Sequence, residues 1–280
     1  MTYLRHTRRS RPAARRAGRA LRILFSALAL VFMLAPAAQA SKGQFHVSCD
    51  FSHAAMDDPI VSPGEPGSSH VHNFFGNTST DAFSTYASMR KSSTSCSFGA
   101  DTSGYWAPAL MDQSGNVVTP KGMTAYYLAR GKVTAPPKNL RMIAGGDTSK
   151  LRISGYACGE GNATSSVPND CGSAWLKGVI VFPSCWDGKR LDSPNHRRHM
   201  AYPTGKGCPK GHPVQLPKIV FHITYGIHDG RGYALVSDEM MGMKHGMSLH
   251  ADLWNTWNQS VLEQQVSDCL NAGDSCDLGG

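Results

Sequence analysis

The sequence predicts a mainly β fold, β-sandwich-like with long loops and a C-terminal helix, in one disulfide-stapled domain. The chain contains 29 glycines and 16 prolines, so turn signals recur about every ten residues. Short runs of β-branched and aromatic residues lie between these turns, as in sandwiches and barrels. The eight cysteines are the third observation, because small exported domains use disulfides to hold long loops.

The expected strands follow these runs in order, at residues 45–47, 117–118, 123–128, 178–182, 219–225 and 233–236. The C-terminal helix is expected from Ser260, because Ser260 and Glu263 form a capping box and Gly273 ends the segment. The apolar residues that follow lie on one face of the expected helix: Val261, Leu262, Val266, Cys269 and Leu270. Residues 80–91 are predicted to form a second, short helix.

Residues 1–40 have the pattern of a secretory signal peptide. A basic segment is followed by an apolar run over residues 23–34 and by the small-residue site Ala38-Gln39-Ala40. The alternative is a membrane anchor, but the apolar run is shorter than the ~20 residues that span a bilayer. We therefore expect residues 1–40 to be cleaved and residues 41–280 to form a single secreted domain, extracellular or periplasmic.

The formal charge of +8 comes from this leader. Eight of the 28 Lys and Arg residues lie before residue 41 with no Asp or Glu, which leaves 20 basic and 20 acidic residues in the rest of the chain. A nucleic-acid partner is therefore not predicted. No later segment is apolar enough to span a membrane, so no membrane partner is expected after cleavage.

All eight cysteines follow the leader, and an even number in an exported chain indicates disulfides. No CxxC pair is present, which disfavours thiol redox chemistry and a zinc ribbon. Eight cysteines allow 105 pairings. Closure between neighbours gives Cys49–Cys96, Cys158–Cys171, Cys185–Cys208 and Cys269–Cys276, and we expect the loop between Cys185 and Cys208 to be functional.

The segment "SSHVHNFFGN" carries two histidines with one residue between them, His70 and His72. On a strand both rings face the same side, with Phe74 beside them, so they can meet one metal ion or one substrate. The Pro-Gly turns before them predict a strand at a loop-rich edge. The alternative is that both histidines only bond loop backbone. The spacing is similar to a cupin motif, but the glutamate and third histidine of that motif are absent.

Three other stretches combine histidine and aspartate, whose side chains transfer protons and bind metals. "SHAAMDDPIVSPG" contributes His53, Asp57 and Asp58; "CWDGKRLDSPNHRRHM" contributes Asp187, Asp192, His196 and His199; "MSLHADLW" contributes His250 and Asp252. We expect at least two of these clusters to converge, and His199 and Asp187 to approach the two histidines. The alternative is that the aspartates only cap turns.

Nine motifs in order, from "FHVSC" through "SHVHNFFGN", "YWAPAL", "FPSCWDGKRLDSPNHRRHMAYP" and "CPKGHPVQLPKI" to "SLHADLWNTW", resemble a secreted bacterial and fungal family, the domain of unknown function numbered nineteen ninety-six. The resemblance spans Phe45 to about Asn271. It implies an exported single-domain protein and supplies no reaction. In fungi such domains are often attached to modules thought to bind carbohydrate, which favours a polysaccharide substrate.

One departure from the family precedes "SLHAD", where relatives have a short Ser/Gly turn and this chain has "MMGMKHGM". Thioethers and imidazoles suit Cu(I). Methionine is also a common filler of irregular cores, and we expect that role here.

The leading functional interpretation is a secreted carbohydrate-active enzyme, a polysaccharide hydrolase or lyase acting on a polysaccharide or cell-wall glycan. Hydrolysis of a glycoside needs an acid and a second carboxylate. The candidate catalytic residues are His70, His72, Asp187, Asp192, His196, His199, His250 and Asp252. The candidate ligand-binding residues are His53, Asp57, Asp58, Phe74 and Trp186, with Trp186 as a platform for a sugar ring and Trp254 and Trp257 in the core.

Two alternatives remain open. The first is a non-catalytic glycan-binding or cell-surface module, in which the histidines organise loops. The second is a His-dependent metal-binding protein with His70 and His72 as the first ligands. Apart from such a metal no cofactor is predicted, and the sequence leaves the oligomeric state open.

Overall fold

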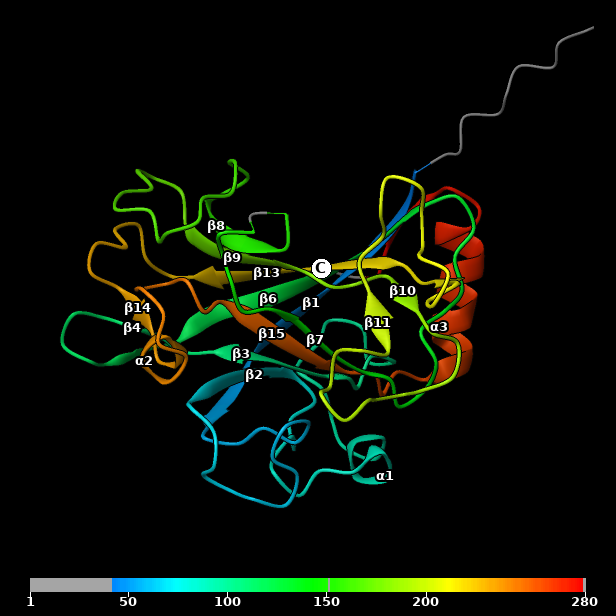
Figure 1. The fold of residues 1–280 in the computed structure, drawn as a ribbon, viewed down its shortest axis with the longest axis horizontal. Helices are drawn as coiled ribbons and strands as arrows, with labels where there is room; N and C mark the ends of the chain where they lie inside the picture. The colour runs from blue at the N-terminus through cyan, green and yellow to red at the C-terminus, as the bar shows by residue number, and fades with distance from the viewer. Residues whose placement is uncertain (1–41, 151, 279–280) are drawn as a thin grey trace, which may run out of the picture. The chain divides into compact units, whose positions relative to one another are not determined.

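One long strand, β1 (Lys42–Ala55), joins the two halves of the main sheet. The computed structural model describes residues 42–150 and 152–278. From Lys42 to Asp50, β1 pairs with β6 (Pro120–Arg130). After an irregularity between Phe51 and His53 it pairs with β2 (His72–Gly76). The change of partner at this bulge turns the sheet from one half to the other (Figure 1).

Each half continues outward from β1 in antiparallel order. The first half adds, after β6, strands β13 (Lys218–Tyr225), β9 (Leu176–Val181) and β8 (Ser154–Cys158). The second half adds, after β2, strands β3 (Gly104–Pro108), β15 (His250–Trp254) and β7 (Arg141–Gly145). A short strand, β16 (Ser275–Asp277), pairs with β1 in parallel.

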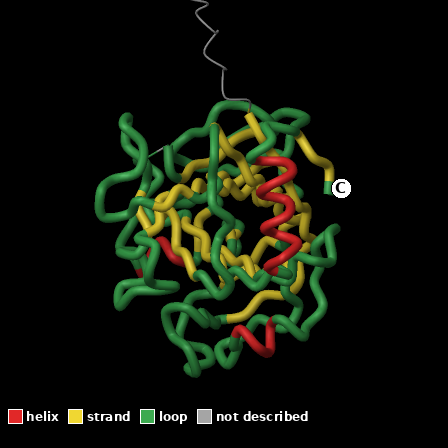
Figure 2. Tube along the Cα trace, turned by 90° about the vertical axis from the view of Figure 1, so that its right-hand side faces the viewer, coloured by secondary structure: helices red, strands yellow, loops and turns green. Residues whose placement is uncertain are grey.

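Smaller elements complete the fold. Two three-stranded sheets consist of β10 (Cys185–Trp186), β11 (Met200–Ala201) and β12 (Val214–Gln215), and of β4 (Leu110–Met111), β5 (Val117–Val118) and β14 (Ala234–Leu235). The helices are α1 (Tyr86–Met89), α2 (Ser237–Met240) and α3 (Gln259–Gln265), and α3 runs on into the π-helical turn η1 (Val266–Leu270). Figure 2 shows this C-terminal helix lying alongside the strands.

The main core lies between the facing surfaces of the two halves. Phe45 and Tyr127 of the first half stack with ring centroids 4.6 Å apart, and Trp257 packs on both. Tyr105 of the second half meets Phe221 of the first at 5.2 Å. Two sheet halves that bury their inner faces against each other make the fold sandwich-like, as the sequence predicted.

A smaller apolar cluster lies on the outer face of the second half. It contains Ile60, Phe74, Met89, Trp106, Ile143 and Trp254. Successive side chains of a strand alternate between faces, so Phe75 and Tyr105 enter the main core while Phe74 and Trp106 point outward. This outer cluster packs beside the candidate site described below.

The strands expected from the sequence are all present, and the C-terminal helix is confirmed. The helix begins after Asn258, not at Ser260, and the helix expected over residues 80–91 is limited to Tyr86–Met89, which Thr85 caps. The prediction that the strand after His70 lies at a loop-rich edge was wrong. β2 is hydrogen-bonded on one side to β1 and on the other to β3, and all five of its residues are buried.

The four disulfides join the pairs that closure between neighbours predicted: Cys49–Cys96, Cys158–Cys171, Cys185–Cys208 and Cys269–Cys276. Four disulfides are typical of proteins from oxidising compartments. Among the residues described, we find no helix with the length and apolarity that a membrane crossing requires. The expected signal peptide, residues 1–40, lies outside the described residues.

A buried carboxyl group in the main core predicts a pH dependence of stability. Asp101 accepts hydrogen bonds from the Tyr105 hydroxyl at 2.6 Å and from the Ser103 amide at 3.0 Å, and burial raises its pKa from 3.8 to about 7. Because the folded protein holds this proton more tightly, its free energy of unfolding falls as the pH rises from about 4 to about 7.

We expect the free energy of unfolding of Asp101→Asn to depend less on pH. The difference from the wild type should be on the order of a few kcal/mol between about pH 4 and about pH 7. Melting temperatures of both proteins between pH 4 and pH 8 measure it. Parallel curves for the two proteins would show that Asp101 does not cause the pH dependence.

Candidate functional site

Three histidines converge on the outer face of the second half of the sheet. His72 begins β2, His250 begins β15, and His70 lies two residues before β2. Their ring centroids are 4.2 Å apart for His70 and His72, 5.1 Å for His70 and His250, and 5.9 Å for His72 and His250. The three imidazoles therefore form one cluster built from segments far apart in the sequence.

The register of the strands explains this convergence. Phe74, Trp106 and Asp252 lie opposite one another across β2, β3 and β15, and His72 lies opposite Pro108. Since β3 and β15 are antiparallel, His250 falls at the level of Pro108, two residues before Asp252. Residues two apart on a strand share a face, so the sheet presents both histidines and Asp252 on the same side.

Hydrogen bonds fix which nitrogen of two of these rings is free. Nδ1 of His72 lies 2.9 Å from the carbonyl oxygen of Asp57, and Nδ1 of His250 lies 2.8 Å from the carbonyl oxygen of Ser248. A carbonyl only accepts, so each Nδ1 carries the hydrogen and each Nε2 keeps its lone pair. Backbone anchoring of this kind is characteristic of histidines that bind a metal.

Two ring nitrogens of the cluster lack a hydrogen-bond partner among the described residues. Nε2 of His70 and Nε2 of His72 are buried and form no hydrogen bond with the described residues. One ligand atom from each of His70, His72 and His250 lies within 4.8 Å of the other two. A single ion between them could contact all three nitrogens.

Two buried carboxyl groups adjoin the histidines. Asp252 is 1% exposed, and neither of its carboxyl oxygens has a hydrogen-bond partner among the described residues. Asp58 accepts hydrogen bonds from the amides of Ile60 and Val61 at 2.9 and 3.0 Å. Ligand atoms of Asp58, His72 and Asp252 also lie within 4.8 Å of one another, so His72 belongs to both groups.

The electrostatics suit a cation. Burial lowers the pKa of His70 to about 4 and that of His250 to about 3. Burial, together with repulsion from these two rings, lowers the pKa of His72 well below its usual value of 6.5. The imidazoles are therefore neutral at pH 7, the form that binds metals. Burial also raises the pKa of Asp252 well above 3.8, and the charge of Asp58 adds to this increase.

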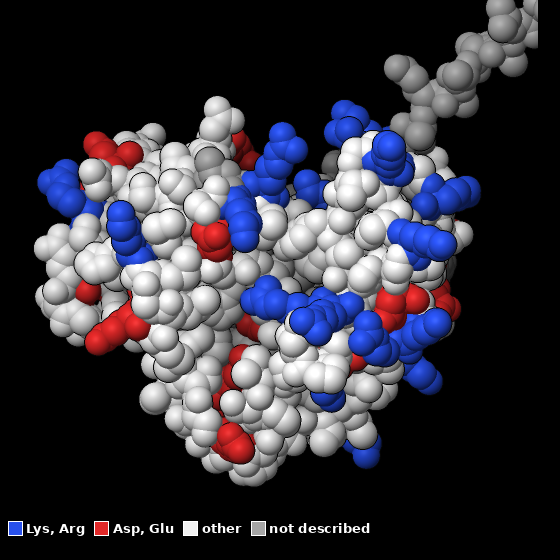
Figure 3. All heavy atoms as spheres, viewed as in Figure 1, with Lys and Arg blue, Asp and Glu red and all other residues white. Residues whose placement is uncertain are grey.

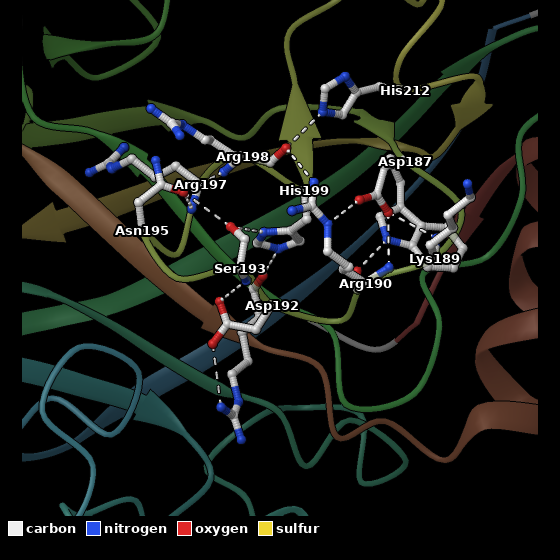
Figure 4. Close-up of polar contacts among 12 residues, drawn as sticks. Asp187, Lys189, Arg190, Asp192, Ser193, Asn195, Arg197, Arg198, His199 and His212 are labelled. Atoms are coloured by element: carbon white, nitrogen blue, oxygen red, sulfur yellow. Dashed lines mark hydrogen bonds and ion pairs between the residues drawn. The ribbon is translucent and has the colours of Figure 1, made fainter.

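Many polar groups of the loop after β10 bond to one another or to the neighbouring strand β7 (Figure 4). Asp187 accepts hydrogen bonds from the amides of Lys189 and Arg190 at 2.9 Å and from the Arg190 guanidinium at 2.7 Å. His199 is hydrogen-bonded through both ring nitrogens, with Nδ1 3.1 Å from the Ser193 hydroxyl and Nε2 2.6 Å from the Arg141 carbonyl oxygen. Neither Asp187 nor His199 belongs to the histidine cluster.

The same loop reaches the cluster through two other residues. Arg197 places its guanidinium 3.4 Å from the Ile143 carbonyl and 3.3 Å from the Gly145 carbonyl, both in β7 beside β15. Burial has the largest effect on both nearby groups, since it lowers the pKa of His250 and raises that of Asp252. The charge of Arg197 has a smaller effect and lowers both pKa values. Sequence reasoning missed Arg197, although it lies next to His196 in the quoted motif.

His196 is linked to the cluster less directly. Its Nδ1 lies 3.0 Å from Asp192, which also pairs with Arg141 at 3.4 Å. Burial raises the pKa of Asp58. The hydrogen bonds from the Val61 and Ile60 amides, and after them the electrostatic effect of His196, partly offset that increase. Asp192 and His196 therefore form a hydrogen-bonded pair at the border of the cluster.

The remaining candidates support the surrounding structure. His53 is bonded through both nitrogens, to Ser52 and to the Thr80 carbonyl, and its ring stacks on Phe74 at 4.8 Å. Asp57 accepts hydrogen bonds from the amides of Gly67 and Ala82, which holds the loop that covers His72.

The predictions for the tryptophans and for the methionines of residues 240–247 have different outcomes. Trp186 donates to the Arg190 carbonyl and packs against the main core. Trp254 and Trp257 are buried, as expected. The prediction that the methionines of residues 240–247 fill the core was wrong for Met240 and Met241, which are 65% and 44% exposed because they lie at the end of the short surface helix α2.

These features define a mainly β, disulfide-linked protein with a buried cluster of histidine and aspartate on one sheet face. The family model described as Domain of unknown function (DUF1996) matches residues 58–257, and the chain belongs to this family. The matched region contains Asp58, His70, His72, His250 and Asp252. Comparison with the curated proteins and with the solved structures gave no match.

Proposed function

We propose that this protein binds one divalent transition-metal ion through His70, His72 and His250, next to the carboxyl groups of Asp252 and Asp58. The observation that carries the proposal is the set of three imidazoles with ligand atoms within 4.8 Å of one another. Two of them have buried Nε2 atoms that form no hydrogen bond with the part of the chain that the structure describes, and unsatisfied buried polar groups are costly. An ion would satisfy these nitrogens and neutralise the buried carboxyl groups.

The donor set selects the class of metal. Imidazole nitrogen suits Zn²⁺, Cu²⁺, Ni²⁺ and Co²⁺, and a nearby carboxylate is compatible with all of them. Ca²⁺ and Mg²⁺ prefer shells of oxygen ligands and are not expected to bind. Zn²⁺ is an ion that three histidines hold in known catalytic centres, with water in the fourth position.

A centre of this type supplies hydrolytic chemistry when an ion is bound, because three protein ligands leave a position for water. The residues of this chain hold the rings in the required tautomer through the carbonyls of Asp57 and Ser248. The proposal includes export, which four disulfides support. It also includes a polysaccharide substrate, for which the support is the resemblance to fungal relatives that carry modules thought to bind carbohydrate.

A glycosidase that uses Asp58 and Asp252 as its carboxylate pair is the weaker alternative. The two groups are close, but they are only 5% and 1% exposed. A sugar must reach both carboxyl groups in that mechanism. The burial of these groups therefore favours an ion over a sugar ring as their direct neighbour.

The proposal predicts binding of one equivalent of Zn²⁺ or Co²⁺ to the tag-free protein after treatment with a chelator. We expect His70→Gln to weaken that affinity by about 10-fold or more, because one of three ligands is lost. Calorimetric titration with Zn²⁺ and the absorption bands of bound Co²⁺ measure it.

His212→Gln is the matched control, because His212 bonds the Arg198 carbonyl away from the cluster and should leave the affinity unchanged. The proposal fails if the wild type binds neither ion, or if the His70 and His212 variants lose affinity equally.

A further inference from the structure

We infer that a second site, on the first half of the sheet, binds an acidic carbohydrate chain. A cavity of about 750 Å³ opens there, which is within the usual range for small-molecule sites. Its walls are the ends of β1, β6, β9 and β13 and the loops around residues 152–153 and 202–203. No ligand of the candidate metal centre lines this cavity.

Of the residues that the structure describes, four cations and no carboxylate line the cavity: Lys42, Arg130, Arg152 and Lys218. Lys42 lies directly opposite Arg130 on the neighbouring strand, and Lys218 lies opposite Leu128, two residues from Arg130. Three of the four cations therefore share one face at one end of the sheet. Figure 3 shows basic side chains spread over the upper middle and right of the face that it views, with some acidic side chains among them.

This arrangement is unfavourable in the free protein. Like charges directly opposite each other on paired strands destabilise a sheet. Within residues 42–150 and 152–278, no ion pair or hydrogen bond engages the side chains of these four cations. A bound anion would relieve the repulsion, which is the first reason to assign a negatively charged ligand.

A row of rings continues the same sheet face beyond the cations. His46 and Tyr126 lie opposite each other on β1 and β6, with ring centroids 5.5 Å apart, and His222 on β13 is 4.8 Å from Tyr126. The three rings are half-buried, and Nδ1 of His222 is buried without a partner among the described residues. Such rings offer flat faces to the C–H side of a sugar and nitrogen or hydroxyl groups to its hydroxyls.

The size of the cavity and the balance of charges in the chain indicate which class of ligand this site binds. The cavity is much larger than a single phosphate, and its apolar walls include Val181 and Ile153. Nucleic acid is recognised by extended basic surfaces, whereas this chain has 20 basic and 20 acidic residues after residue 40. A chain of sugars with carboxylate or sulfate groups matches both the four cations and the neighbouring rings.

The test is calorimetric titration of the full chain with oligogalacturonate and heparin fragments, with cello-oligosaccharides as neutral ligands. We expect the acidic oligosaccharides to bind, more weakly as salt increases, and the neutral ones not to bind. Arg130→Gln and Lys218→Gln should each weaken binding by about 10-fold, with an unchanged or higher melting temperature because a repulsion is removed. Arg231→Gln is the control, since Arg231 pairs with Asp229 in a distant loop.

Several results would overturn the inference. Equal binding of neutral and acidic oligosaccharides would exclude charge as the basis of recognition. Equal binding of a single-stranded DNA of the same charge, or loss of affinity in the Arg231 variant, would indicate only a general attraction. Binding of inorganic phosphate as tight as that of the oligosaccharides would indicate a simple anion site. Because His70→Gln should leave oligosaccharide binding intact, failure of the metal proposal does not affect this one.

Discussion

Asp252→Asn is expected to stabilise the metal-free protein and to remove most of the stabilisation that Zn²⁺ gives the wild type. Both carboxyl oxygens of Asp252 are buried without a hydrogen bond to the described residues. Burial raises the pKa of Asp252. The free energy that the folded protein loses by holding this carboxyl group therefore increases as the pH rises above 3.8. Asparagine has the same shape and carries no charge, so it avoids that loss.

With Zn²⁺ present, the sign of this effect reverses. An ion that binds only the folded wild type adds about 4 kcal/mol at 1,000 times its dissociation constant. Asparagine cannot supply the negative charge next to the ion, so the variant should gain much less. The measurement is the melting temperature of both proteins at pH 8, first with a chelator and then with excess Zn²⁺. The shift that Zn²⁺ causes in the wild type is compared with the shift in Asp252→Asn.

Asp192→Asn is the matched control for this experiment. Asp192 is also a carboxylate near the cluster, but it is paired with Arg141 and His196 and lies outside the groups that could hold an ion. Its replacement should leave the Zn²⁺ effect unchanged. If Asp252→Asn instead destabilises the metal-free protein by more than about 2 kcal/mol, its carboxyl group has a structural role, and the metal assignment loses its main electrostatic support.

The sequence alone predicts which side chains of a local motif share a face. Alternation along a strand places His70 with His72, and His250 with Asp252, on the same side. It cannot say that the two pairs meet, because that depends on the strand order β2, β3, β15. The same limit applies to Lys42 and Lys218, which lie together only through the register of β1, β6 and β13.

The sequence also cannot show whether a polar side chain has a hydrogen-bond partner in the folded protein. The motif "CWDGKRLDSPNHRRHM" is rich in polar residues, yet Asp187 is already bonded to Arg190, and His199 to Ser193 and Arg141. Asp252 lies in the more apolar "MSLHADLW", and its carboxyl group has no hydrogen-bond partner within residues 42–150 and 152–278. Residue type indicates possible chemistry, whereas packing around each group determines whether it remains available.

Fold prediction succeeded where the signal is local. Neighbouring cysteines pair, and strands with one exposed face alternate, as in β6 and β13. Strands buried on both faces have no such alternation, and β2, β3 and β15 are buried at every residue. These three strands carry much of the candidate site, so the position of the site could not be predicted from the pattern.

Gly76→Ala, at the end of β2, is expected to lower the free energy of unfolding by more than about 3 kcal/mol. Gly76 has a φ of +74°, and an added Cβ would lie 2.3 Å from the Ser103 carbonyl oxygen. A left-handed backbone costs a residue with a Cβ about 1–2 kcal/mol, and an overpacked position adds about 1–3 kcal/mol. The backbone cannot easily move, because Gly76 bonds Ser95 through its amide and its carbonyl.

Urea unfolding of Gly76→Ala and Gly64→Ala separates these two causes. Gly64 has a similar φ of +81°, but an added Cβ there meets no atom within 4 Å. Gly64→Ala should therefore show only the backbone cost of about 1–2 kcal/mol. The additional loss in Gly76→Ala comes from the contact with Ser103, and it should be accompanied by weaker Zn²⁺ binding because β2 carries His72. Equal losses in the two variants would show that this end of β2 adapts freely, and that His72 is not held rigidly in place.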